Sequence, residues 1–302
     1  FASFASRIAD LQQKLHLSNA ALGSALFVMP LGLLFTMPFT NYLLGKHGSR
    51  KVMLAGSIGY SVFLCCIGFA TQTWQFAAGL FLFGASRNLM NIPINAQGVG
   101  VQNLYNKSII SSFHGIWSVS GFLAASLGGY MIKDAIGTEI HFLIVALLLL
   151  AIVSIFYKHT YKHDLPTGDK KKMFSIPNGN LLKIGLIAFT VMSCEGTMYD
   201  WSSVYFKKVV QAVPAHQAWG YIAFTIAVSS ARFVGDWFVN KFGVKKILLA
   251  CGSFTALGFF VSAFFPTMNT AILGFALVDI GVSCVVPFTM SLAGKFAGNL
   301  PL

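Results

Sequence analysis

Long apolar stretches alternate with short polar breaks along almost the whole chain. Most of these stretches are close to the ~20 residues that an α-helix needs to cross ~30 Å of hydrocarbon. Barrel strands would instead show short segments that alternate with a period of two residues, and no such pattern recurs. The pattern predicts an all-α polytopic membrane protein with nine spanning helices, near residues 20–45, 52–71, 74–98, 109–132, 141–157, 181–205, 216–240, 246–265 and 268–293.

The two ends of the chain carry no boundary signal. The first fifteen residues have the pattern of the end of an earlier helix, and Phe1 is preceded by neither an initiator Met nor a signal-peptide pattern. We therefore expect a truncated helical protein.

The composition excludes an ordinary soluble protein. Hydrophobic residues make up 56% of the chain and charged residues only 10%, with a mean hydropathy of +0.70, whereas soluble domains have about a quarter of their residues charged. A net charge of +12 would indicate nucleic acid in a soluble protein, but in a membrane protein Lys and Arg gather on cytoplasmic loops. We therefore predict a lipid bilayer around the chain and no nucleic-acid partner.

The basic residues also predict the orientation of the chain. Successive loops lie on opposite sides of the membrane, and most basic residues fall on one of the two alternating sets of loops. The positive-inside rule makes that set cytoplasmic. The opposite set holds Arg7, Lys14, Lys133, Lys207 and Lys208.

A polar segment divides the chain into two apolar blocks. Residues 158–180 are rich in Pro, Gly and Lys, which is typical of a linker. The sequence therefore predicts an N-terminal helical bundle over residues 1–157, a cytoplasmic linker over 158–180, and an incomplete C-terminal bundle over 181–302. Residues 46–56, KHGSRKVMLAG, match residues 241–252, KFGVKKILLACG, which predicts a parallel repeat and two pseudo-symmetric bundles.

At this loop the chain resembles the major facilitator superfamily. That family carries Gly-x-Leu-x-Asp-Arg-x-Gly-Arg-Arg/Lys between its second and third helices, and this frame holds Leu43, Lys46, Gly48, Arg50 and Lys51. The acidic position of the motif is Gly45 here, and its first glycine is Asn41. The second copy keeps Lys241, Gly243 and Lys245. By this resemblance, Lys46, Gly48, Arg50 and Gly243 belong to a cytoplasmic gate.

Other stretches are similar to the fucose-permease-related branch of sugar and drug carriers. They are SRIADLQQKLHLSNAALG, NIPINAQG, FHGIWSVSG and CEGTMYDWSSVYF. The resemblance covers the chain nearly end to end and matches the end of helix 1 through helix 10 of a twelve-helix protein. It implies a monomeric secondary transporter that moves a small solute by alternating access, often with a proton, at a site between its two halves.

Ionisable side chains within the spans are candidates for proton coupling, because a charge inside the membrane is costly unless it is paired, hydrated or functional. Glu195 lies ~21 Å into its span at 1.5 Å per residue, where it could take up and release a proton or remain protonated as a packing residue. Asp200 reaches the predicted extracellular interface, where a solvated role at the helix end is the alternative to coupling. His114 can titrate in the physiological range, although a local hydrogen bond to backbone is the simpler interpretation.

Two charges at similar depth are candidates for solute binding. Asp279 lies near the middle of its span, and Arg87 with Asn88 lies at comparable depth in the corresponding helix of the first half. In the resembled family these two helices line the central cavity. Arg87 and Asp279 either pair across that cavity or bind polar groups of a solute, whereas local neutralisation inside each bundle is the alternative.

The helix of Arg87 carries further polar residues. Asn91 and Asn95 follow Arg87 at intervals of four residues and share its helix face, and Gln97 follows. Amides suit sugar hydroxyls because each offers a donor and an acceptor, although interhelical packing bonds are the alternative. Trp201 could contribute an aromatic wall for a sugar ring, or it belongs to an ordinary aromatic belt.

Arg232 and Asp236 lie one helical turn apart near the predicted cytoplasmic end of their helix. Mutual pairing at this spacing would neutralise both charges. We interpret this pair as a structural and gating clamp.

Several function classes find no support in the sequence. It contains no His-Glu-x-x-His, Gly-x-Ser-x-Gly, Walker or haem-attachment motif, so we predict that the chain is not an enzyme and has no cofactor. The cysteines lack the paired spacing of metal sites, so no metal is expected. A channel is less favoured, because a parallel repeat suits two rocking halves better than a fixed pore.

The sequence therefore predicts a multi-pass secondary transporter of a bacterial plasma membrane. Proton symport of a small, sugar-like polar solute is the leading hypothesis. Export of a drug or metabolite, or a sensor built on the same fold, are the alternatives. The direction of transport is not determined by these residues, since a carrier can run either way with its gradients.

Overall fold

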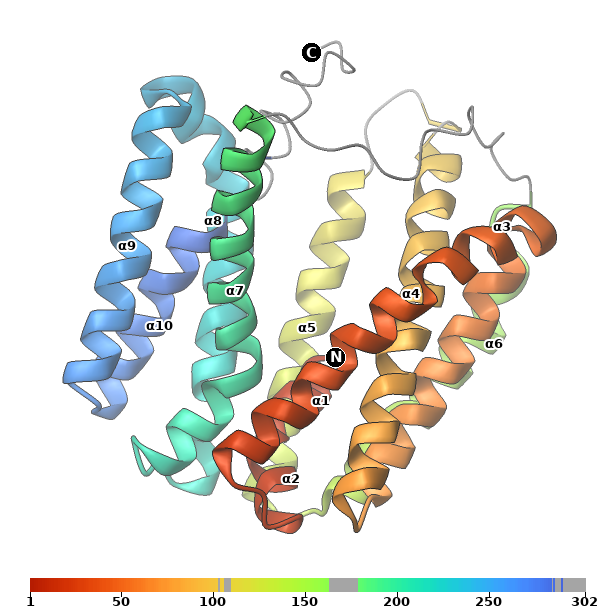
Figure 1. Ribbon diagram of the computed structural model, residues 1–302, viewed down its shortest axis with the longest axis horizontal. Coiled ribbons are helices and arrows are strands. Elements are labelled where there is room, and N and C mark those ends of the chain that lie inside the picture. Colours follow the sequence, from red (N-terminus) through yellow and green to blue (C-terminus); the bar gives the residue numbers. More distant parts are fainter. Residues whose placement is uncertain (103, 106–109, 163–178, 284, 286–288, 290–302) are drawn as a thin grey trace. The chain divides into compact units, whose positions relative to one another are not determined.

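A computed structural model describes residues 1–102, 104–105, 110–162, 179–283, 285 and 289 (Figure 1). Within these residues every regular element is a helix and no strand is present, which confirms the all-α prediction. The elements are α1 (Ala2–Ser6), α2 (Ile8–Lys14), α3 (Asn19–Phe69), α4 (Thr73–Gln102), α5 (Ile110–Lys133), α6 (Thr138–Phe156), η1 (Tyr157–His159), α7 (Gly179–Lys208), η2 (Pro214–His216), α8 (Trp219–Phe242), α9 (Val244–Phe264) and α10 (Met268–Ser283).

Length and hydropathy identify membrane-crossing helices within this described part of the chain. Four helical segments are long and apolar enough to cross a membrane: Asn19–Phe69, Thr138–His159, Leu181–Lys208 and Lys245–Phe264. The first has 51 residues, or ~77 Å at 1.5 Å per residue, which is more than twice the hydrocarbon thickness. Helix α3 therefore contains both of the first two predicted spans, and it folds back on itself in Figure 1.

The turn inside α3 occupies one residue rather than the loop that the sequence predicts. Gly48 has φ 78° and ψ 160° and separates two helical segments without further irregular backbone. Gly243 has φ 81° and ψ 150° and joins α8 to α9 in the same way. This region of φ and ψ is open almost only to glycine. The two repeats that match in sequence therefore also match in backbone conformation.

The shared backbone conformation of these two turns gives a direct prediction. Gly243→Ala should lower the free energy of unfolding by about 1–3 kcal/mol, because a Cβ atom is strained at this φ and ψ. Gly252→Ala is the control, since no atom lies within 4 Å of a Cβ built at Gly252 inside α9. Unfolding of the purified protein by SDS titration measures both variants. Equal stabilities for the two variants would contradict the prediction.

The first fifteen residues differ from the predicted helix end. They form two short helices, α1 and α2, with a break at Arg7, which has φ −111° and ψ 6°. The Arg7 side chain turns to bond the backbone carbonyl of Ile136 and to pair with Asp10. The bond to Ile136 joins residues 129 positions apart, so the local sequence pattern does not reveal it.

Contacts group the chain into two compact units. Unit 1 contains residues 1–6, 118–133 and 172–302, and unit 2 contains residues 7–117 and 134–171. The N-terminal bundle predicted from the sequence, residues 1–157, includes residues 1–6 and 118–133, which the contacts group with the C-terminal residues in unit 1. The predicted C-terminal bundle is 181–302. Those limits stay a prediction.

Unit 2 depends on a close approach of α3 and α4. A Cβ atom at Gly32 would lie 2.0 Å from the backbone oxygen of Phe81, and one at Gly84 would lie 2.0 Å from the backbone oxygen of Met29. Gly56 makes a third such contact with the α4 backbone. Small residues let helix backbones approach in this way, and van der Waals packing rather than the hydrophobic effect then holds the helices together in lipid.

Unit 1 has a core made by α7, α8 and α10. Its buried members are Met198, Phe206, Phe224, Ala271, Phe275, Val278 and Val282. Helix α10 also packs closely on α9, where a Cβ at Gly258 would lie 2.5 Å from the Gly274 backbone oxygen. This packing positions the two buried carboxyls described next.

Candidate functional site

Glu195 is a buried carboxyl on α7. Glu195 is 8% exposed. The helix that carries it is long and apolar enough to cross a membrane. The hydroxyl of Tyr199, one turn further along α7, donates to Glu195 Oε1 at 3.4 Å. A carboxyl in such a place could exchange a proton, because burial makes its charged form expensive.

Asp279 is a second buried carboxyl in the same unit. It is 0% exposed within α10, and its neighbour Val278 belongs to the core of unit 1. A fully buried carboxyl is rare unless it is paired, protonated or functional. The sequence singled out Asp279 by its depth along the span, and its role in solute binding stays a prediction.

The polar face predicted on α4 is partly accessible within unit 2. Asn91 and Asn95 are exposed and Arg87 is half-buried. The amide of Asn95 donates to the backbone oxygen of Asn91 at 2.9 Å, which leaves the side-chain amide of Asn91 at the surface of this helix. These three residues could offer hydrogen bonds to a polar solute.

Asn88 on the same helix is bonded inside unit 2. Its amide nitrogen donates to Thr40 Oγ1 at 3.0 Å and contacts Thr36 Oγ1 at 3.5 Å. These bonds join α4 to the first half of α3. Asn88 therefore has the interhelical bonds that were the alternative to solute binding.

Gln97 is bonded in a similar way at the far end of α4. Its amide nitrogen donates to Ser49 Oγ at 2.6 Å and to the Tyr161 backbone oxygen at 3.0 Å, while its oxygen accepts from the Tyr161 backbone nitrogen at 2.8 Å. A Cβ at Gly100 would lie 2.7 Å from the Tyr161 ring. Gln97 thus fastens the segment after α6 to α3 and α4.

Arg50 fastens the same end of the unit from α3. Its Nε donates to Thr160 Oγ1 at 2.8 Å, and a terminal nitrogen donates to the Tyr157 backbone oxygen at 3.0 Å. Its guanidinium carbon lies 4.4 Å from the centre of the Tyr157 ring, which is cation–π geometry. The predicted gate residue Arg50 is therefore held to the C-terminal end of α6.

Each copy of the basic repeat carries a lysine over an aromatic ring one turn earlier. Lys46 Nζ lies 5.8 Å from the ring centre of Tyr42, and Lys241 Nζ lies 4.8 Å from that of Trp237. Sequence reasoning missed this pairing, although the i, i+4 spacing of an aromatic residue and a lysine before each turn glycine is its signal.

The remaining predicted residues fall into two groups. Asp200 and Trp201 are half-buried on α7. His114 lies within α5, and Arg232 and Asp236 lie within α8, but their side chains fall outside the described part of the chain.

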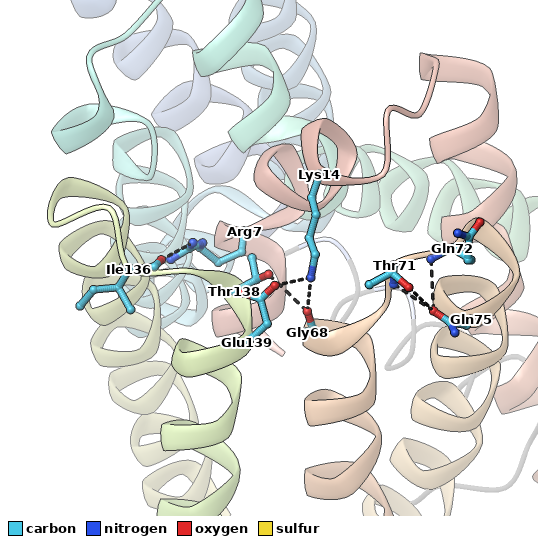
Figure 2. A network of polar contacts seen from close by, with 9 residues as sticks. All are labelled: Arg7, Lys14, Gly68, Thr71, Gln72, Gln75, Ile136, Thr138 and Glu139. Atoms are coloured by element: carbon cyan, nitrogen blue, oxygen red, sulfur yellow. Dashed lines mark hydrogen bonds and ion pairs between the residues drawn. The ribbon is translucent and has the colours of Figure 1, made fainter.

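Polar contacts fasten the other end of α3 and α6, as Figure 2 shows. The ammonium of Lys14 on α2 donates to the Gly68 backbone oxygen at 2.7 Å and pairs with the Glu139 carboxylate on α6. Thr138 Oγ1 lies 3.5 Å from the same Gly68 oxygen. Lys14 therefore bridges α2, the C-terminal end of α3 and the first turn of α6, where an acidic side chain is favoured by the helix dipole.

Arg7 completes this network. A terminal nitrogen of Arg7 donates to the Ile136 backbone oxygen at 2.7 Å (Figure 2). The Nε atom of Arg7 lies 2.7 Å from Asp10 Oδ2. Burial lowers the pKa of the Arg7 guanidinium from its ordinary value, whereas the Asp10 and Glu139 carboxylates act to raise it. An arginine stays charged under such opposing effects, because the guanidinium group is strongly basic.

A double-mutant cycle tests the Lys14–Glu139 pair. Lys14→Met should lower the free energy of unfolding more than Glu139→Gln, because Lys14 also donates to Gly68. The coupling between the two substitutions should be about 0.5 kcal/mol, since both side chains are partly solvent-exposed. SDS unfolding at low and high salt measures the cycle, and the coupling should fall as salt screens the charges. Strictly additive effects at low salt would contradict the pairing.

A protein site for a metal ion needs a set of ligand side chains that lie close together. Within the parts of the chain that the structure describes, no group of three or more His, Cys, Asp or Glu side chains could hold a metal ion.

Comparison with known proteins identifies a family and relatives. The sequence profile described as Major Facilitator Superfamily matches residues 1–300. An uncharacterized MFS-type transporter of Yersinia pestis is 30% identical over 301 residues, which are 97% of this chain and 76% of the relative. An uncharacterized transporter of Sinorhizobium fredii is 29% identical over 294 residues, covering 96% of this chain and 78% of the relative.

A solved structure supports the fold. The crystal structure of the nucleoside transporter NupG matches with a TM-score of 0.72, over 98% of this chain and 78% of that one, at 14% sequence identity. At this identity the likeness concerns the fold alone.

Proposed function

Because this chain belongs to the Major Facilitator Superfamily, a family of membrane transporters, we propose that it moves a sugar-like polar solute together with protons by alternating access. The family and the relatives that match are transporters rather than enzymes, which supports a small solute as the substrate. Proton symport is the finer hypothesis. The observation that carries it is the buried Glu195 carboxyl on a membrane-crossing helix.

Glu195 is our candidate for the proton carrier. Protonation and deprotonation of a carboxyl with little solvent contact couple to the surrounding packing, because burial disfavours the charged form. The Tyr199 hydroxyl supplies a donor for the charged form. Asp200 and His114 are the weaker candidates for the same task.

Each unit contains residues that we propose for solute binding. In unit 2, Arg87, Asn91 and Asn95 present donors and acceptors on α4, and in unit 1 the candidates are Asp279 and Trp201. Asn88 and Gln97 were also candidates, and their bonds to Thr40, Ser49 and Tyr161 support a role in holding the helices.

Alternating access requires bundles that move as bodies. In unit 2, α6 is tied to α3 at one end by Lys14 and at the other by Arg50, which supports motion as one body. We propose that the bundles of residues 1–157 and 181–302 rock about a cytoplasmic gate. The gate residues are Lys46, Gly48, Arg50, Arg232, Asp236 and Gly243.

We assign the chain to the fucose-permease-related branch on the stretches NIPINAQG, FHGIWSVSG and CEGTMYDWSSVYF. A bacterial plasma membrane and a monomeric state follow from that assignment. The charge bias of the loops supports placing the basic repeat on the cytoplasmic side.

Proteoliposomes with an internal pH dye test the proposal. A panel of sugars is added outside, followed by a panel of amphiphilic drugs, and proton movement is recorded for each compound. Proton influx set off by a sugar is the expected result. Proton efflux set off by a drug would replace symport by export, and binding without flux would replace the transporter by a sensor on the same fold.

A further inference from the structure

We propose that Tyr199 is a positioning residue for Glu195 and that the docking of α1 on α7 holds it in place. This inference rests on the proposed role of Glu195 in proton coupling. All of the residues concerned belong to unit 1, so the argument concerns one compact body.

The ring of Tyr199 is held by aromatic rings from two other parts of unit 1. The Phe1 ring meets it edge-on at 5.6 Å and 83°, and the Phe224 ring on α8 meets it at 4.9 Å and 84°. Tyr221, also on α8, lies at 5.8 Å and 52°. Edge-to-face pairs at such distances are favourable beyond the area they bury. These rings limit the positions that the Tyr199 hydroxyl can take.

The hydroxyl of this fixed ring contacts the Glu195 carboxyl. It donates to Oε1 at 3.4 Å across one helical turn, which is long for an O–H···O bond. A small displacement of the ring is therefore enough to break this hydrogen bond. A donor to a carboxylate stabilises its charged form and opposes protonation.

The segment of Phe1 and α1 contacts the Tyr199 ring from one side. All residues of α1 are buried, and Ser203 Oγ on α7 donates to the Ala5 backbone oxygen at 3.2 Å. Phe1, immediately before α1, also packs on Phe4 at 6.2 Å. When α1 is docked, Phe1 presses on Tyr199, and the hydroxyl stays at the carboxyl. Displacement of α1 removes this support and releases the hydroxyl.

Other titratable groups on the elements around Glu195 must be held constant in a test. On α7 they are Lys183, Cys194, Asp200, Tyr205, Lys207 and Lys208, on α8 Tyr221, Arg232, Asp236 and Lys241, and on α10 Asp279, while Phe1–Ser6 carries no titratable side chain. The Tyr199→Phe and Phe1→Ala variants leave all of these groups unchanged.

Labelling of Glu195 by a hydrophobic carbodiimide tests the inference, since this reagent modifies protonated carboxyls. The protein is labelled in detergent or liposomes across a pH series, without solute or gradient, and modification at residue 195 is read by peptide mass spectrometry. Tyr199→Phe removes the hydroxyl and keeps the ring. We expect labelling to persist to higher pH, with the midpoint raised by about one pH unit. Phe1→Ala should raise the midpoint in the same direction by a smaller amount.

Tyr205→Phe is the matched control on the same helix. The Tyr205 hydroxyl donates to the Ser262 backbone oxygen at 2.5 Å, so this variant loses a hydroxyl and a hydrogen bond in the same core without touching Glu195. It should leave the labelling midpoint unchanged. An unchanged midpoint in Tyr199→Phe, or an equal shift in Tyr205→Phe, would overturn the inference.

This readout is independent of transport. A protein that moves no protons can still show the shift, which would support the positioning role while the proposed function fails. A protein that performs symport but shows no shift in Tyr199→Phe would keep the proposed function and lose the inference.

Discussion

Glu195→Gln is expected to abolish solute-driven proton movement and to leave solute binding largely intact. Glutamine has nearly the same shape as a protonated glutamate, so the packing of α7 is preserved, but its amide cannot release a proton. The loss should be about 100-fold, in the range found when a proton-transferring side chain is removed. Proton flux in proteoliposomes and solute binding in detergent measure the two effects separately.

Two further variants make this result specific. Asp134→Asn replaces an exposed carboxyl and should leave proton flux unchanged. Asp200→Asn replaces the half-buried carboxyl of the same helix and should reduce flux less than Glu195→Gln. If Asp200→Asn abolished the flux while Glu195→Gln retained it, Asp200 would replace Glu195 as the proton carrier.

Gly84→Ala is expected to lower the free energy of unfolding by about 3 kcal/mol. A Cβ at this position would lie 2.0 Å from the Met29 backbone oxygen and 2.9 Å from its carbonyl carbon. Backbone atoms cannot rotate away as a side chain can, so α3 and α4 must separate by about 1 Å and lose close packing along their contact. Gly32→Ala should behave alike, because it faces the Phe81 backbone at the same distance.

Gly185→Ala is a control that should change the free energy of unfolding in the opposite direction. No atom lies within 4 Å of a Cβ at Gly185 in α7, so alanine should stabilise the helix by up to about 1 kcal/mol through its higher helix propensity. Reversible SDS unfolding compares the variants. If Gly84→Ala and Gly185→Ala shifted the unfolding midpoint alike, the close contact of α3 with α4 would be wrong.

The helices were largely predictable, because each apolar stretch of spanning length is visible directly in the sequence. Each predicted span coincides with a helix to within about three residues at its described ends, since a segment in lipid must satisfy its backbone hydrogen bonds internally. The repeat was also visible, as Gly48 and Gly243 share a sequence context. The sequence predicted a loop at each of these places and did not reveal that a single glycine joins the two helices. The length of such a connection depends on how the two helices pack.

The candidate site was predictable in part. Depth along a span singled out Glu195 and Asp279, and both are buried. Periodicity placed Asn91 and Asn95 on one helix face, and both are exposed, whereas Asn88 and Gln97, candidates on the same helix, are bonded within unit 2. Spacing along a helix gives the face of a residue, whereas the neighbouring helix decides what that face contacts.

The sequence by itself determined the class of this protein: an all-α chain in a membrane, with a parallel repeat and a few polar residues in its spans. These properties depend on the local balance of apolar and polar side chains, which acts over one helix at a time. Only the tertiary structure decided the partners of the polar groups, such as Lys14 with Gly68 and Glu139, Gln97 with Tyr161, and Tyr199 with Phe1 and Glu195. Except for the Tyr199–Glu195 contact within α7, such pairs join residues far apart in sequence, and close packing fixes them.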